Sequence, residues 1–194
     1  MIDAAVAALR AGRPVVLPTD TVYGLCAEPT EASAAEVARL KGRAEAQPIA
    51  LLAASVDTLL ELVPELPERL LRALLPGAYT LVLPNPARRF RWLTGTRPEA
   101  IGVRVPELER NARAIVDQVG ALAATSANLP GAPDPKRLDD VPEKIRSGCA
   151  QVVDAGELPG TPSTVIDLTG SEPVVLREGA APAAEALERL AQLV

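Results

Sequence analysis

The chain has 194 residues, of which 48% are hydrophobic and 23% charged, and its formal net charge is −5 at pH 7. This length and apolar content exclude a disordered chain and fit one domain with a large core, so we expect a single domain over residues 1–194. The negative net charge argues against a domain that coats nucleic acid, although it is compatible with a local cationic pocket.

The predicted elements alternate between helices and strands along the whole chain. The first segment, MIDAAVAALRAGRP, predicts an amphipathic helix ending at Gly12, and Ser33 and Glu36 form a candidate capping box for a helix to about Lys41, which Gly42 would end. Further helical patterns cover 55–62, 67–75, 108–119, 141–147 and 182–193. Short apolar runs predict strands at 15–18, 49–52, 80–83, 101–105, 122–125, 152–153, 163–167 and 174–176. Strands that are apolar on both faces, with helices between them, indicate an α/β fold with a twisted mixed sheet covered by helices on both faces.

Two connecting segments are longer than the ~12 residues that loops of a compact domain rarely exceed. Residues 84–98 (PNPARRFRWLTGTRP) contain four arginines and the only tryptophan, and residues 126–140 (SANLPGAPDPKRLDD) are rich in proline and small polar groups. Long loops of this kind often form lids or binding segments, so we expect both loops to overhang a site.

Several site classes are excluded by composition. The chain contains no histidine and two cysteines, Cys26 and Cys149, so it lacks the usual zinc ligand sets and a Ser-His-Asp triad. It also contains neither a G-x-x-x-x-G-K-[ST] phosphate loop nor a G-x-G-x-x-G fingerprint. No uncharged apolar run reaches the roughly 18 residues of a membrane helix, and the N-terminus lacks the pattern of an export signal. We therefore expect a soluble, cytoplasmic protein.

Polar clusters at the predicted strand ends are the candidate site, since ligands of open α/β sheets bind there. In PTDTVYG, Asp20 and the threonines could line a site or only satisfy the backbone of a turn. Lys41 and Arg43 could bind phosphates or form a solvated, cationic helix end. Lysine is rare here, with Lys41 one of three, so a compact charge beside an arginine fork suggests phosphate binding.

Two further clusters leave the same choice open. Arg104 lies between Val103 and Val105 in a short apolar strand, where a guanidinium is costly to bury without an anionic partner; that partner could be a ligand or an interior carboxylate. Ser126 and Asn128 could bind a ligand or cap the following turn.

Taken in order, the motifs PTDTVYGL, KGR, PGAYTLVLP, RWLTG, IGVRVP, ATSAN, STVID and LREG resemble the YrdC-like family of threonylcarbamoyl-AMP synthases, from about residue 14 to 180. The resemblance implies that L-threonine, bicarbonate or CO₂, and ATP react to give L-threonylcarbamoyl-AMP and pyrophosphate, with Mg²⁺ as cofactor. Partner proteins would then transfer the threonylcarbamoyl group to tRNA, with a weak direct tRNA contact as a further expectation. The length and RWLTG resemble the short bacterial form.

The resemblance also implies residue roles. It assigns ATP binding to Lys41, Arg43, Ser126, Asn128 and Arg177, with Lys41 and Arg43 as the catalytic pair. It assigns threonine binding to Thr21, Arg104 and Ser163, and leaves the magnesium ligands unassigned.

Two features limit the transfer and leave an alternative. Cys26 stands where relatives commonly have glycine, and we interpret it as a packing residue because free cysteine is mostly a small buried hydrophobe. Glu107 and Leu108 stand where relatives often have a histidine. The alternative function is a noncatalytic RNA-binding module, which the acidic net charge disfavours.

Overall fold

The computed structural model describes residues 1–42 and 47–193, so Arg43 lies outside the described residues. In these residues, no helix has the length and apolar character that crossing a membrane requires. The strands of the described chain are β1 (Val15–Pro18), β2 (Tyr23–Ala27), β3 (Ala50–Ala53), β4 (Tyr79–Pro84), β5 (Ala100–Arg104), β6 (Ala121–Ser126), β7 (Gln151–Val152), β8 (Thr164–Asp167) and β9 (Val174–Arg177).

The described strands form one sheet of nine, in the order β7-β1-β2-β6-β3-β5-β4-β8-β9. Three pairs are parallel (β1 with β7, β3 with β5, β4 with β8) and the others antiparallel, so the prediction of a mixed sheet is confirmed. The sequence patterns did not predict one strand, β2. The sequence suggests only a turn there, because β2 contains Gly24 and begins two residues after the polar run Thr19–Thr21. Pairing with β1 and β6 nevertheless makes all five of its residues a buried strand.

Each predicted helix is present, with ends within three residues of those expected. The helices are α1 (Ile2–Arg10), α2 (Glu31–Lys41), α3 (Val56–Leu62), α4 (Glu68–Leu74), α5 (Arg110–Val119), α6 (Glu143–Gly148) and α7 (Ala183–Ala191). Two short 3₁₀ turns occupy the long loops, at Arg91–Leu93 and Leu138–Asp140.

Helix α2 shows one success and one error of the sequence pattern. It ends at Gly42, which adopts the left-handed conformation (φ 63°) that favours glycine at a helix C-terminus. The predicted capping box is wrong, since the N-cap is Thr30, whose hydroxyl accepts from the backbone N–H of Ser33. Glu36 instead pairs with Arg39 on the exposed side of the helix, so its carboxylate is not available to the helix start.

The two faces of the sheet have different covers. On one face, which we call the five-helix face, large side chains such as Leu51, Leu81 and Val103 pack against α2, α3, α4, α6 and α7. On the other, the two-helix face, residues of β1, β2, β3 and β6 pack against α1 and α5. In the described chain, the apolar cluster on the two-helix face includes no residue of β4, β5, β8 or β9, so that half of the face is left for a concave site.

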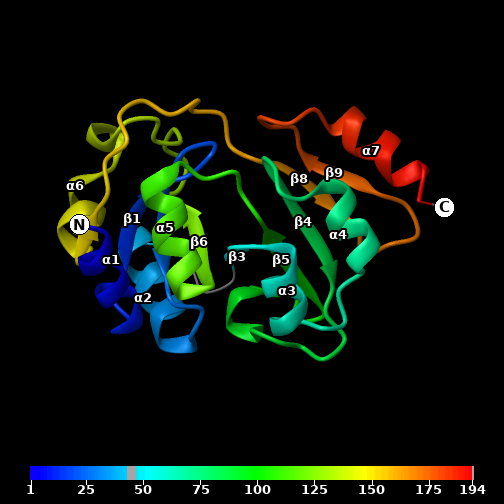
Figure 1. Cartoon of the computed structure of the whole chain (residues 1–194), viewed down its shortest axis with the longest axis horizontal. Helices are drawn as coiled ribbons and strands as arrows, with labels where there is room; N and C mark the ends of the chain where they lie inside the picture. Colours follow the sequence, from blue (N-terminus) through cyan, green and yellow to red (C-terminus); the bar gives the residue numbers. More distant parts are fainter. Residues whose placement is uncertain (43–46, 194) are drawn as a thin grey trace.

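Figure 1 shows how the helices are distributed between the two ends of the sheet. Helices α1, α5 and α6 lie beside the half of the sheet that contains β1 and β6, and α3, α4 and α7 lie beside the half that contains β4, β8 and β9. The chain crosses from the first half to the second after α6, in the segment coloured yellow to orange.

In the half of the sheet that contains β8 and β9, two backbone segments approach each other closely at Gly179, which follows β9. A Cβ on Gly179 would lie 2.5 Å from the carbonyl carbon of Ser163 and 2.6 Å from the N of Thr164, distances that real Cβ atoms do not show. The Gly179 N–H donates to the Thr164 hydroxyl (2.8 Å), and the Ala180 N–H donates to the Pro162 carbonyl (2.8 Å). Glycine is therefore needed there to bring β9 and Arg177 against Ser163.

We expect Gly179→Ala to lower the free energy of unfolding by about 1–3 kcal/mol, because the added methyl overpacks against backbone that cannot move as a side chain can. Gly170→Ala is the matched control, since a Cβ there meets nothing closer than 3.8 Å. Urea denaturation of both variants checks the prediction; equal stability of the two would contradict it.

Candidate functional site

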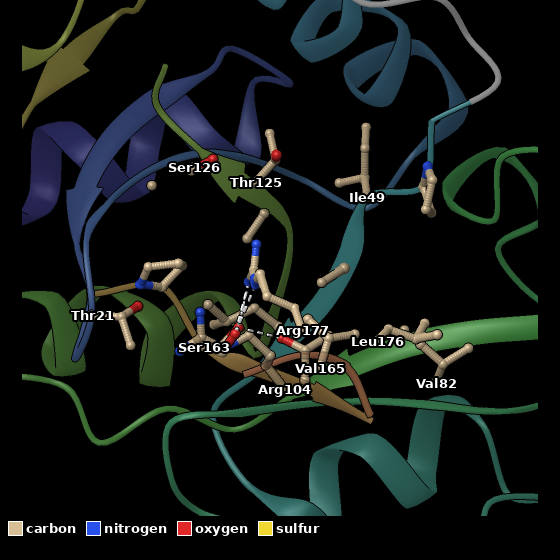
Figure 2. Close-up of a pocket in the computed structure, with 18 of the residues that line it drawn as sticks. Thr21, Ile49, Val82, Arg104, Thr125, Ser126, Ser163, Val165, Leu176 and Arg177 are labelled. Carbon is tan, nitrogen blue, oxygen red and sulfur yellow. Dashed lines mark hydrogen bonds between the residues drawn. The ribbon is translucent and has the colours of Figure 1, made fainter. Parts of the chain in front are cut away.

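A cavity of about 350 Å³ occupies the open half of the two-helix face (Figure 2). Its floor is made of alternate strand residues with small side chains, Ala50, Thr80, Gly102 and Ala124. The intervening residues on these strands, such as Leu81 and Val103, point to the five-helix face and are fully buried. Because successive side chains of a strand lie on opposite faces, small residues such as Ala50 and Gly102 leave room on one face without weakening the core on the other.

Arg104 lies at the end of β5 and lines the cavity. Its Nη2 donates to Oδ1 of Asp20 (2.6 Å), and both side chains are only 10% exposed. The other Asp20 oxygen accepts from the backbone N–H of Glu107 (3.3 Å). Of the two anionic partners that the sequence left open for Arg104, an interior carboxylate is therefore present.

The pair is strongly desolvated. Burial lowers the pKa of the Arg104 guanidinium and raises the pKa of the Asp20 carboxyl, and in each case the partner's charge opposes the shift. Removing one member of such a pair leaves an uncompensated buried charge, which typically destabilises by about 3–5 kcal/mol. Within the described chain, Nε of Arg104 is buried and has no hydrogen-bond partner, so Asp20 leaves one donor of this guanidinium unsatisfied.

Ser163 and Arg177 lie together on the β8–β9 side of the cavity (Figure 2). The Arg177 guanidinium donates to the Ser163 carbonyl through Nη2 (2.8 Å) and Nε (3.1 Å), and Nη2 also approaches the Ser163 hydroxyl (3.3 Å). That hydroxyl is 2.7 Å from the hydroxyl of Thr80 on β4. Arg177 thus orients a serine that is 4% exposed, at the same cavity as Arg104.

Thr21 is fully buried and lines the cavity beside Thr19. The two hydroxyls are 3.0 Å apart, and the Thr19 hydroxyl donates to the Val22 carbonyl (2.7 Å). The Thr21 carbonyl accepts from the N–H of Gly160 (2.9 Å). Both interpretations of PTDTVYG are therefore compatible with the structure, because the segment is a hydrogen-bonded turn whose threonines also face the cavity.

Lys41 was expected at a solvent-facing helix end or at the site mouth, and the solvated alternative is wrong because the residue is 1% exposed. Its Nζ donates to the Ser126 carbonyl and to Oδ1 of Asn128 (2.9 Å). The same amide oxygen accepts from the Ser126 hydroxyl (2.7 Å), and Nδ2 of Asn128 donates to the Ala132 carbonyl (2.7 Å). Lys41 and Asn128 therefore support Ser126, which lines the cavity.

The structure thus brings most of the predicted site residues to one place. Thr21, Arg104, Ser126, Ser163 and Arg177 line the cavity. Lys41 and Asn128 join it through Ser126, and Arg43 falls outside the described residues.

Two cavity residues that the motif assignments did not include come from the loop at 84–98. Thr94 and Arg97 line the cavity, as expected of a loop that overhangs a site, and Arg97 is held by Asp167 (Nη1–Oδ2, 2.7 Å). Asp20 was noted in the sequence but given no site role. The signal for it was Arg104 itself, since a buried arginine requires an anionic partner; that this partner is the Asp20 carboxylate depends on the fold.

Two chemical expectations concern sulfur and metal ligands. Cys26 is 1% exposed and packs under α1 and α5, as predicted, and burial raises the pKa of its thiol to about 12. In the described part of the chain, no three His, Cys, Asp or Glu residues lie close enough together to hold a metal ion.

Comparison with known proteins gives matches over almost the whole chain. Residues 7–179 match the Sua5/YciO/YrdC family model, which is described as telomere recombination. A Mycobacterium tuberculosis (strain H37Rv) protein, provisionally named a threonylcarbamoyl-AMP synthase, is 37% identical over 183 residues, 92% of this chain and 83% of the relative. The Pyrococcus abyssi threonylcarbamoyl-AMP synthase is 37% identical over 182 residues, 91% of this chain and 53% of that protein.

Solved structures agree. The P. abyssi Sua5 structure in complex with L-threonine superposes with a TM-score of 0.88 at 35% identity, covering 97% of this chain and 57% of that one. Escherichia coli YciO superposes with a TM-score of 0.83 at 27% identity, covering 96% of this chain and 92% of that one. The chain spans little more than half the length of the P. abyssi protein. Since the family match includes every described strand from β1 to β9 and the residues that line the cavity, the chain belongs to the Sua5/YciO/YrdC family of YrdC-like threonylcarbamoyl-AMP synthases.

Proposed function

We propose that this chain synthesises L-threonylcarbamoyl-AMP from L-threonine, bicarbonate or CO₂, and ATP, releasing pyrophosphate, for the threonylcarbamoyladenosine modification of tRNA. The observation that supports the proposal most directly is that the residues assigned to the two substrates line the same cavity. Arg104, Ser163 and Thr21, the residues assigned to threonine, and Ser126 and Arg177, assigned to ATP, all line it. A single cavity with both sets can hold the two reactants in contact.

The first step joins threonine to the carbon source. The threonine amino nitrogen forms a bond to the carbon of CO₂ with loss of a proton, or to the carbon of bicarbonate with loss of water. Arg104 holds the threonine carboxylate through the donors that Asp20 leaves, while the Ser163 and Thr21 hydroxyls contact the rest of the amino acid. Fixing the substrate at several points favours the reaction by orientation.

In the second step, an oxygen of the resulting carbamate bonds to the α-phosphorus of ATP, and the bond from that phosphorus to pyrophosphate breaks. Negative charge accumulates on the phosphate oxygens, and fixed cations stabilise it without a histidine base. Lys41, buried behind Ser126, and Arg177 supply such charge from described residues, and the resemblance assigns the same role to Arg43. Mg²⁺ would enter bound to the ATP phosphates, as part of that substrate.

The product is a mixed anhydride, so a partner that transfers its threonylcarbamoyl group to tRNA is part of the proposal. A noncatalytic RNA-binding module is disfavoured by the net charge of −5.

The direct test is to incubate the purified chain with ATP, L-threonine, bicarbonate and Mg²⁺. We expect pyrophosphate release that requires threonine, with a product of the mass of the mixed anhydride. ATP turnover that does not depend on threonine would refute the proposed reaction.

For Arg104→Lys we expect the threonine KM to rise at least tenfold, about 1.4 kcal/mol, with ATP affinity changed by less than threefold. Lysine keeps the charge but has no planar fork, so it cannot hold Asp20 and a substrate carboxylate in the same geometry. Arg113→Lys, at an exposed ion pair on α5, is the matched control. A loss of ATP affinity at unchanged threonine KM would show that the carboxylate assignment is wrong.

For Lys41→Arg we expect kcat/KM to fall at least tenfold, about 1.4 kcal/mol of transition-state stabilisation. We also expect a lower melting temperature, because the larger guanidinium does not fit the buried position between Ser126 and Asn128. Lys144→Arg, an exposed position on α6, is the control for the exchange itself. If Lys41→Arg released pyrophosphate at the wild-type rate and had the wild-type melting temperature, Lys41 would have no role at this site.

A further inference from the structure

Gly102 lies in the middle of β5 and its missing side chain faces the cavity. It is on the same face of the strand as Arg104, and it pairs across the ladder with Val82 of β4. A glycine inside a strand weakens that strand, because it has a large conformational entropy and no side chain to pack. Its presence on a central strand therefore needs a reason.

Neither the backbone nor the packing supplies that reason. The φ angle of Gly102 is outside the left-handed range that favours glycine, and a Cβ built on it would meet nothing closer than Thr80 Cγ2, at 3.8 Å, an ordinary contact. Gly24, which lines the same cavity, differs: a Cβ there would be 3.3 Å from the sulfur of Cys26 and 3.4 Å from Thr19 Cγ2. The described protein thus has room for a side chain at 102 and leaves it unfilled.

A second, independent feature of the same cavity points to a ligand beside Gly102. Arg104 is two residues further along the strand, roughly 6.6 Å away, with its side chain 10% exposed and its Nε without a partner in the described chain. A carboxylate bound at Arg104 would have the Asp20 carboxylate on one side, where Nη2 of Arg104 already donates a hydrogen bond to Asp20.

The ladders show where the rest of such a ligand must extend. Ala50 pairs with Ala124, and β3 runs parallel to β5 in the register Leu51 with Val103, which places Ala50 beside Gly102. Ser126 follows two residues after Ala124, on the side of Gly102 away from Arg104. The direct line from Arg104 to a nucleotide at Ser126 therefore crosses β3 at Ala50, and an amino acid that follows this line lies beside Gly102.

We propose that Gly102 is a specificity-determining residue, and that the space left by its side chain is occupied by the body of the amino acid substrate whose carboxylate pairs with Arg104. This inference rests on the proposed function and names the part of the cavity that sets the size of the amino acid. Ala50 and Ala124 extend this row of small side chains on the cavity floor toward Ser126, where the nucleotide would bind.

The test is Gly102→Ala, with Gly102→Val as a graded second variant. Because alanine fits the empty position and stabilises the strand, we expect the melting temperature of Gly102→Ala to stay the same or rise. Its threonine affinity, measured by calorimetry, should fall at least tenfold, serine affinity should fall less because serine lacks one methyl group, and ATP affinity should stay within threefold. Gly102→Val should lose threonine binding altogether.

The outcomes separate this inference from the proposed function. If the wild-type chain binds no threonine, the proposed function fails. If the wild type binds threonine and Gly102→Ala binds it equally well, with the same preference over serine, only the role of Gly102 is overturned. A lower melting temperature for Gly102→Ala, beside an unchanged Gly170→Ala control, would also overturn it, since the glycine would then serve the fold.

Discussion

The alternation of side chains along β-strands is the constraint on which this structure depends. Each central strand must bury one set of residues under α2, α3, α4, α6 and α7, while the other set is covered by α1 and α5 over only half of its extent. The uncovered half would expose apolar surface to water if it carried large residues. It carries Thr80, Gly102 and Val82 instead, so the same strands form a tight core on one face and a cavity on the other.

The buried cations in and behind this cavity are tolerated because each of them has fixed partners. Arg104 is paired with Asp20, and Lys41 is held by the Ser126 carbonyl and the Asn128 amide oxygen. These contacts join segments far apart in the chain, the turn after β1 to β5 and the end of α2 to the end of β6. The buried cations therefore link stability to the site geometry: a residue that would orient substrate also ties two halves of the sheet together. Preorganised charge of this kind stabilises a transition state without reorganisation during the reaction.

The glycines illustrate how such a site can be distinguished from a structural feature. Gly42 ends a helix in a left-handed conformation, and Gly179 lets two backbone segments meet. Gly102 satisfies neither condition and lies on the cavity floor. A residue that the fold would accept in a larger form, at a position that faces a cavity, is better explained by what the cavity must hold than by the stability of the chain.

The sequence by itself determined the elements and the motifs, because both depend on local patterns. Apolar periodicity gave eight of the strands and all seven helices of the described chain, and Arg104 between two valines indicated a buried cation that needs an anionic partner. It could not show that Tyr23–Ala27 forms a strand, since β2 becomes one by pairing with β1 and β6 rather than through its own propensity. The identity of the partner of Arg104, the burial of Lys41 and the empty position at Gly102 were decided only by the tertiary structure, because each depends on which side chains the sheet brings together from distant parts of the chain.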